Sequence, residues 1–278
     1  MSMDVKLHLE KQSKNLVQKM DFSNIHSLLE ERYQRYCKPE FIETDPVQIP
    51  HFFTQKEDIE ISGFLASTIA WGQRKAIIAG AKRLMNMMNM SPYDFVMNAS
   101  PGELQRLDSF VYRTFQPVDC LFFITSLRHI YANCGGLQTV FTEGYRTTNS
   151  IFGALLHFRR IFMETPHLQR SAKHVPDVKR GASAKRLNMF LRWMARGNDG
   201  IDFGLWREIP VSALMLPLDV HTGNVGRQLE LLTRKANDWK AVEEITANLR
   251  QFDPHDPVKY DFALFGLGVF EGGIKNNE

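Results

Sequence analysis

Apolar residues recur along most of this chain at spacings of three and four, the period of an amphipathic helix. The pattern is clear over residues 22–37, where Ile25, Leu29 and Tyr33 fall on one face. The same period predicts further helices over 57–90, 119–131, 137–164, 184–196, 238–252 and 258–269. We find neither a series of alternating, strand-like segments nor an internal repeat. The pattern therefore predicts an all-α protein.

The predicted helices fall into a short extension and one large domain. Residues 4–20 have the composition of a polar helix, so we assign 1–21 as an N-terminal helical extension and 22–278 as a single domain. Two long connections interrupt the domain, a proline-punctuated loop over 38–51 and a basic loop over 165–182. A chain of 278 residues is long enough to bury a large core, as one body or as two lobes.

The composition, 44% hydrophobic and 23% charged, is that of an ordinary soluble protein. No run of 18 apolar residues predicts a membrane span, and the first residues lack the apolar core of a signal peptide. Three cysteines at wide spacing, without a C-x-x-C pair, argue against a disulfide framework and against a cysteine-based zinc or iron–sulfur site. We therefore expect a cytoplasmic protein without a metal.

Basic residues are concentrated in one part of the chain. The segment from Arg159 to Arg196 holds ten lysines and arginines but only two acids, although the whole chain has a net charge of +3. Such a block is typical of a protein that binds a phosphate backbone. A basic face exposed only to solvent gives the same pattern. The sequence leaves both interpretations open.

Within this block, residues 184–196 read as an amphipathic helix with Ser183 as its cap. Its apolar stripe consists of Leu187, Phe190, Leu191 and Met194. Lys185, Asn188, Arg192 and Arg196 fall largely away from that stripe, so we expect them on the polar side of the helix.

A single carboxylate, Asp219, follows an apolar run that contains two prolines. From Val225 onward apolar residues recur at helical spacing, which predicts a helix from Asp219 to about residue 234. A carboxylate at a helix start has two uses. It accepts hydrogen bonds from the free backbone N–H groups there, or it presents a buried negative charge to a cleft. The residues alone do not decide between the two.

Three segments resemble the helix-hairpin-helix DNA glycosylase superfamily. Residues 64–84, with Gln73 in a turn between two helical halves, look like the superfamily's glutamine-bearing turn. The stretch Leu-Asp-Val-His-Thr-Gly-Asn-Val-Gly-Arg-Gln-Leu that ends at Leu229 is similar to the segment that carries the catalytic aspartate. Residues 259–268 are similar to its late helix. The resemblance implies a two-lobed helical fold with a central cleft.

The chain departs from the superfamily at the glycine-rich hairpin, where 176–190 stand instead. Lys185, the candidate for the nucleophilic lysine, lies 34 residues before Asp219. This region resembles the divergent hairpin of archaeal 8-oxoguanine glycosylases. The motif Lys-Arg-Leu-Asn-x-Phe-Leu-Arg-Trp-Met is shared with an uncharacterised bacterial family. The iron–sulfur cysteines of the endonuclease III branch are absent from this sequence.

The resemblance implies removal of a damaged base, such as an oxidised purine, from double-stranded DNA with that base flipped out. Asp219 would stabilise the positive charge that develops on the sugar. Lys185 would attack the sugar, which requires a neutral amine that neighbouring positive charge favours. An exposed lysine at a helix start is an equally plain interpretation of Lys185. We expect a monomer that needs no cofactor.

The other predicted contacts follow from the same resemblance. For nucleic-acid binding the candidates are Gln73, Arg74, Lys179, Arg180, Arg186, His221 and Arg227. For stacking on the flipped base the candidates are Trp71, Trp193 and Trp206. Two alternatives remain. A protein of this fold can bind nucleic acid without catalysis, and Asp219, His221, His255 and Asp256 would be the ligands of a metal-dependent hydrolase.

Overall fold

The computed structural model describes residues 21–197 and 199–274, and the helix predicted over 4–20 lies outside these ranges. The described part is built of helices, with two isolated β-bridges and no named strand, which confirms the all-α prediction. The α-helices are α2 (Phe22–Tyr36), α3 (Glu40–Thr44), α4 (Lys56–Thr68), α5 (Arg74–Met87), α6 (Pro92–Asn98), α7 (Pro101–Gln105), α8 (Pro117–Asn133), α9 (Gly136–Thr148), α10 (Ile151–Phe162), α11 (Lys185–Ala195), α12 (Val220–Gln228), α13 (Trp239–Phe252) and α14 (Tyr260–Val269). None of the helices described is long and apolar enough to cross a membrane.

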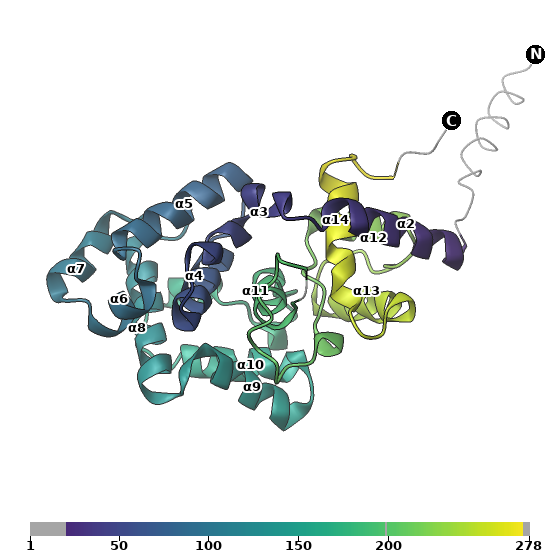
Figure 1. Ribbon diagram of the computed structural model, residues 1–278. Coiled ribbons are helices and arrows are strands. Elements are labelled where there is room, and N and C mark those ends of the chain that lie inside the picture. Colours follow the sequence, from purple (N-terminus) through teal and green to yellow (C-terminus); the bar gives the residue numbers. More distant parts are fainter. Residues whose placement is uncertain (1–20, 198, 275–278) are drawn as a thin grey trace, which may run out of the picture.

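The helices lie in two groups on either side of α11 (Figure 1). Helices α4 to α8 gather on one side, with α9 and α10 below them. Helices α2, α12, α13 and α14 gather on the other side, where α14 packs against both α2 and α12. Helix α11 lies between the groups and packs against α4. The chain therefore brings the start of α11 and the start of α12 toward the middle of the molecule.

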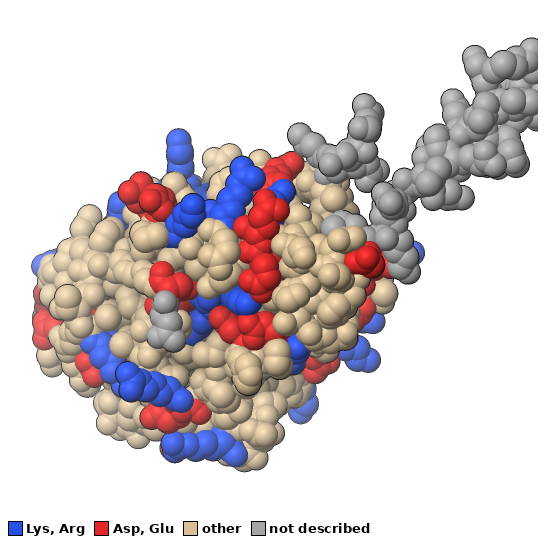
Figure 2. Space-filling model, turned by 45° about the vertical axis from the view of Figure 1, so that its right-hand side comes forward, with Lys and Arg blue, Asp and Glu red and all other residues tan. Residues whose placement is uncertain are grey.

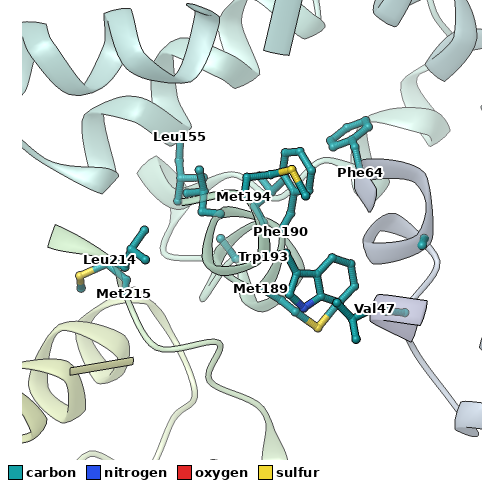
Figure 3. Close-up of a cluster of buried hydrophobic side chains, with 14 of the residues drawn as sticks. Val47, Phe64, Leu155, Met189, Phe190, Trp193, Met194, Leu214 and Met215 are labelled. Atoms are coloured by element: carbon teal, nitrogen blue, oxygen red, sulfur yellow. The ribbon is translucent and has the colours of Figure 1, made fainter. Parts of the chain in front are cut away.

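Aromatic side chains fill the core around α4 and α11. The ring of Phe64 lies within 5.8 Å of the rings of Phe123, Phe158, Phe162 and Phe190, measured between centroids. Figure 3 shows how residues of α11 meet this cluster from the middle of the fold. Rings at such distances add edge-to-face and stacked contacts to the burial of their apolar surface. This packing anchors α11 in the aromatic core.

Two of the predicted stacking residues belong to this core. Trp193 and Trp206 are both fully buried, so neither face of either indole can meet a base, and the prediction was wrong for both. Trp193 lies among core side chains beside Met189 (Figure 3). The indole of Trp206 donates from Nε1 to Oε1 of Glu60 at 2.7 Å. Trp193 is covered because α11 is buried on nearly all sides from Leu187 to Ala195. Trp206 lies outside α11 and is covered because its ring packs against those of Phe141 and Phe190.

The predicted polar side of α11 is likewise buried and does not face solvent. Asn188, Arg192 and Arg196 are 1%, 3% and 2% exposed, respectively. The predicted cap was also wrong, since Ala184 precedes the helix in a left-handed conformation and no side chain caps it. The carbonyl of Ser183 instead accepts a hydrogen bond from Nδ2 of Asn188 at 3.2 Å. Periodicity alone cannot identify a charged residue that the rest of the fold covers.

Two other predicted helices end earlier than the pattern suggested. The single helix predicted over 137–164 is two helices, because Asn149 adopts a left-handed backbone with φ of 50° and ends α9. Ser150 then caps α10 through the backbone N–H of Gly153. The helix that follows Asp219 stops at Gln228 and not near 234. Glu230, with φ of 56°, turns the chain back there.

The close packing of α9 on α10 depends on Gly144. A Cβ atom at this position would lie 2.5 Å from Cβ of His157 and 2.9 Å from Cα of Ala154. We therefore expect Gly144→Ala to lower the free energy of unfolding by about 1–3 kcal/mol, because the helices must move apart. Gly102→Ala is the matched control, since nothing lies within 4 Å of its added Cβ. Urea unfolding would measure both. Equal transition midpoints would refute the close-approach argument.

Candidate active site

Two segments that are far apart in sequence line one central cleft of about 790 Å³. The start of α11 lines it with Lys185, and the start of α12 lines it with Asp219. The turn before α5 and the helix α14 complete its walls. We call this hollow the central cleft. Its volume is in the range of pockets that hold small organic ligands.

Asp219 combines both of the uses that the sequence left open. Its Oδ1 atom caps α12, accepting from the backbone N–H of His221 at 2.8 Å and of Thr222 at 3.0 Å. The hydroxyl of Thr222 in turn accepts from the backbone N–H of Asp219 at 2.9 Å. The other oxygen, Oδ2, lies 4.0 Å from Nζ of Lys185. The cap therefore fixes the carboxylate while its free oxygen faces the amine.

Lys185 reaches the central cleft because the chain enters α11 through left-handed turns. Gly181 has φ of 88° and Ala184 has φ of 51°, and Lys185 is the first residue of the helix. Its side chain is 27% exposed, compared with 23% for that of Asp219. The two groups are thus partly buried together and remain open to a ligand. Their distance makes a loose ion pair, which adds little to stability.

Two buried carboxylates that the sequence analysis missed lie at the floor of the central cleft. Asp45 and Asp261 both line it, and each is 8% exposed. Burial raises the pKa of Asp45. Burial also raises the pKa of Asp261 to about 6, although the guanidinium of Arg192 opposes this shift. Asp261 lies in the late helix that carried the resemblance. The sequence did offer one signal for this residue, since Asp261 is an acid among the apolar residues of that helix.

A network of buried ion pairs underlies the central cleft. Arg192 donates to Oδ2 of Asp261, and its Nε atom lies 3.3 Å from Oδ2 of Asp202. Arg196 donates to Asp202 at 2.9 Å and to Asp256 at 2.8 Å. Burial disfavours the charged form of Arg196, but the neighbouring carboxylates hold its pKa above the usual value. These arginines neutralise acids that burial would otherwise make costly.

Gln73, Arg74 and Trp71 lie together at one wall of the central cleft. Gln73 is exposed and directly precedes α5, after Gly72, whose φ of 101° turns the chain. The guanidinium of Arg74 stacks 4.8 Å from the ring centre of Phe265. Trp71 is half-buried and lines the cleft, so it keeps a surface that a ligand can contact. Of the three tryptophans predicted to stack on a base, it alone lines the cleft.

A neighbouring loop supports Trp71. The buried His174 stacks on its indole with centroids 5.9 Å apart, and burial lowers the pKa of this histidine to about 4. Nε2 of His174 lies 3.3 Å from Oδ2 of Asp119, which also accepts from Arg170 at 2.7 Å. The hydroxyl of Tyr112 donates to the carbonyl of Trp71 at 2.8 Å. The basic loop is thus fixed to the rest of the fold.

Two arginines predicted to bind nucleic acid, Arg186 and Arg227, are engaged within the protein. Arg186 donates to the carbonyls of Thr68 and His174, and burial lowers its pKa to about 10. Its guanidinium also lies 4.9 Å from the ring centre of Trp71. Arg227 donates to the carbonyl of Arg234 at 2.9 Å and to Oδ1 of Asn237 at 2.6 Å. Through these contacts both guanidinium groups support the cleft wall. This differs from the prediction that they bind nucleic acid.

Lys179 and Arg180 are exposed, as a role in binding requires. Arg180 lines a second cavity of about 780 Å³, together with Arg159, Lys173, Lys185 and Arg186. This cavity shares Ser183, Lys185 and Arg186 with the central cleft. A basic hollow therefore adjoins the Lys185 amine. On the face of the molecule shown in Figure 2, by contrast, basic and acidic side chains are interleaved.

The remaining candidates divide between the central cleft and the turn after α13. His221 is exposed, lines the cleft and donates its backbone N–H to Asp219. Asp256 binds Arg196 and caps the turn before α14, and His255 is exposed. In the ranges that the structure describes, no group of three or more histidine, cysteine, aspartate or glutamate side chains is arranged to hold a metal ion.

The chain belongs to the DUF2400 family, whose model is described as a protein of unknown function and matches residues 45–270. No curated protein matches the chain, and neither does any solved structure. The matched region includes Lys185, Asp219 and both buried carboxylates of the cleft floor.

Proposed function

We propose that this protein is a DNA glycosylase that removes a damaged base in the central cleft. The observation that carries the proposal is the 4.0 Å distance between the amine of Lys185 and Oδ2 of Asp219. These residues lie 34 positions apart and on different helices, yet both open into one cleft. The resemblance to helix-hairpin-helix glycosylases assigns a nucleophile and a catalytic carboxylate to the same two positions.

Each residue then has a defined chemical role. As the bond between C1′ and the base breaks, positive charge builds on the sugar, and the fixed negative charge of Asp219 stabilises it. Once the ammonium group of Lys185 has lost a proton to solvent, its nitrogen forms a bond to C1′, and the base leaves with the bonding electron pair and takes up a proton. Loss of the amine proton and opening of the sugar ring give an imine, from which the strand is cleaved by elimination.

The neighbouring features suit a DNA substrate. Gln73 and Arg74 line the cleft wall where a helix pair would meet the duplex, and Trp71 lines the same wall as a surface for a flipped base. The basic second cavity, with Arg180 and Lys173, provides charge for a phosphate backbone next to Lys185. We infer an oxidised purine as the lesion, on the resemblance of the 176–190 region to archaeal 8-oxoguanine glycosylases.

The test is a panel of duplexes, each with one damaged base, incubated with the purified protein. We expect base release followed by strand cleavage for at least one oxidised purine. Lys185→Gln should reduce strand cleavage at least about 100-fold, since the imine cannot form. Lys240→Gln is the matched control, an exposed lysine that lines neither cavity, and should cleave like the wild type.

The exposed basic residues around the second cavity also support a second candidate, a nucleic-acid-binding protein without catalysis. It predicts binding that weakens steeply with salt and no base release from any duplex of the panel. That combination of results would replace the enzymatic proposal. Strand cleavage that persists unchanged in Lys185→Gln would remove the assigned nucleophile.

A further inference from the structure

The connection between α12 and α13 folds back over the start of α12. Arg227, in the last turn of that helix, donates to the carbonyls of Arg234 at 2.9 Å and of Lys235 at 2.8 Å. It also donates to Oδ1 of Asn237 at 2.6 Å. Nδ2 of Asn237 then donates to the carbonyl of Asp219 at 3.1 Å. The amide of Asn237, which lines the central cleft, thus joins the two ends of α12.

The hydrogen bond from Asn237 is not one that α12 needs. The carbonyl of Asp219 already accepts the first helical hydrogen bond, from the backbone N–H of Gly223 at 2.9 Å. A carbonyl oxygen can accept a second bond, and Asn237 supplies it. Because this carbonyl is attached to the Cα atom that carries the carboxylate, the second bond restrains rotation next to the side chain. It therefore orients Asp219 beyond what the helix alone requires.

A carboxamide suits this place because the side chain must accept and donate at once. The guanidinium of Arg227 can only donate, and the carbonyl of Asp219 can only accept. Gly223 leaves room for the amide, since a Cβ atom there would lie 2.9 Å from Oδ1 and 3.1 Å from Nδ2 of Asn237. The residue types at these positions thus agree with the observed hydrogen bonds.

The same connection also binds the segment that leads to Lys185. The backbone N–H of Trp239 donates to the carbonyl of Gly181 at 3.0 Å. Trp239 is the first residue of α13, so this N–H has no partner within its own helix. Its buried indole packs against Phe152, with centroids 5.5 Å apart, which anchors this end of the connection. The connection therefore contacts the backbone at Asp219 and at the turn before Lys185.

We propose that Asn237 is a positioning residue that keeps the carboxylate of Asp219 opposite the amine of Lys185. The two groups lie on different helices, and their loose ion pair across 4.0 Å contributes little to holding them there. A catalytic group must stay within about 0.5 Å of its productive place, so a separate restraint is needed. The effect on base release rests on the proposed function, whereas the spacing of the two groups can be tested without a substrate.

The experiment is zero-length cross-linking of the full chain with a water-soluble carbodiimide, followed by mass mapping of the linked peptides. The reagent activates the carboxylate of Asp219, and the amine of Lys185 displaces the activating group to form an amide bond. Lys259 and Asp253, whose charged atoms lie 2.7 Å apart, provide a reference link in the same sample. We expect Asn237→Ala to lower the yield of the Lys185–Asp219 link at least about 5-fold relative to the reference, because amide formation requires near contact.

Asn248→Ala is the matched control. Nδ2 of Asn248 also donates to a carbonyl of the connection, that of Leu231 at 2.9 Å, but this residue does not line the central cleft. The control variant should keep the wild-type yield of the Lys185–Asp219 link. A wild-type yield in Asn237→Ala, or equal losses in the two variants, would overturn the proposal. So would a wild-type chain that forms the reference link but not the link between Lys185 and Asp219.

Kinetics on duplex DNA separate this inference from the proposed function. Asn237→Ala should lower the single-turnover rate of base release about 10-fold and leave duplex binding unchanged. In the Asp219→Asn background the same substitution should add less than about 2-fold, because the charge that it orients is already absent. The expected cross-linking result without base release by the wild type would keep the positioning role and remove the glycosylase. Base release that Asn237→Ala leaves unchanged would keep the glycosylase and remove the positioning role.

Discussion

Asp219→Asn is expected to lower the rate of base release at least about 100-fold while the fold remains intact. The asparagine oxygen retains the hydrogen bonds from the backbone N–H groups of His221 and Thr222, so α12 keeps its cap. What the substitution removes is the negative charge that faces Lys185 across 4.0 Å. Loss of one preorganised electrostatic contact costs about 100- to 1000-fold in rate. Single-turnover kinetics on the preferred duplex would measure it.

A second capping aspartate provides the control for this variant. Asp238 caps α13 through the backbone N–H of Ala241 at 3.1 Å and does not line the central cleft. Asp238→Asn should therefore leave the rate close to that of the wild type. Thermal unfolding of both variants would check that the helices persist. A wild-type rate in Asp219→Asn would show that its carboxylate only caps the helix.

Arg196→Met is expected to lower the free energy of unfolding by about 3–5 kcal/mol, the largest stability effect that we predict. The guanidinium is 2% exposed and binds Asp199, Asp202 and Asp256. The apolar replacement fills much of the space but leaves these carboxylates without their shared counterion. Breaking a buried pair by removing one partner leaves an uncompensated charge, which is why the cost is large. Urea unfolding monitored by circular dichroism would measure it.

Arg234 is the matched control because its ion pair lies at the surface. Its side chain is 40% exposed and pairs with Asp238. Arg234→Met should cost less than about 1 kcal/mol, since solvent screens such pairs. Adding Asp256→Asn to Arg196→Met should recover part of the loss, because among the described residues this carboxylate is ion-paired with Arg196 and its charge is unpaired once Arg196 is gone. Equal losses in the two single variants would contradict the proposed role of the buried network.

The sequence predicted helices best where one face is solvent-exposed and a cap marks the start. Helix α2 begins after Asp21 and α13 after Asp238, each with its side-chain cap formed, and both match the predicted ranges closely. In these helices apolar periodicity reflects a real division between core and solvent. For α11 the predicted range was right, but the predicted polar side was wrong, because the rest of the fold covers these polar residues as well. That failure also explains the wrong assignment of Trp193.

The candidate site was predicted in part for a similar reason. Lys185 and Asp219 were identified from local motifs, and the fold brings them together in one cleft. The positions of Asp45 and Asp261 at the cleft depend on burial by distant segments, which no local pattern encodes. The sequence could not show whether Asp219 caps the helix or presents its charge to the cleft, since both uses require an acidic residue at the same position. Only the positions of its two oxygens show that it serves both.

The most direct test of the central claim is borohydride trapping on a damaged duplex, followed by mass mapping of the modified peptide. A glycosylase that acts through Lys185 forms an imine between this amine and C1′, and borohydride reduces it to a stable secondary amine. The account predicts one covalent DNA adduct, located on Lys185 and absent from Lys185→Gln. An adduct on another residue, or none on a duplex from which the protein releases the base, would contradict it.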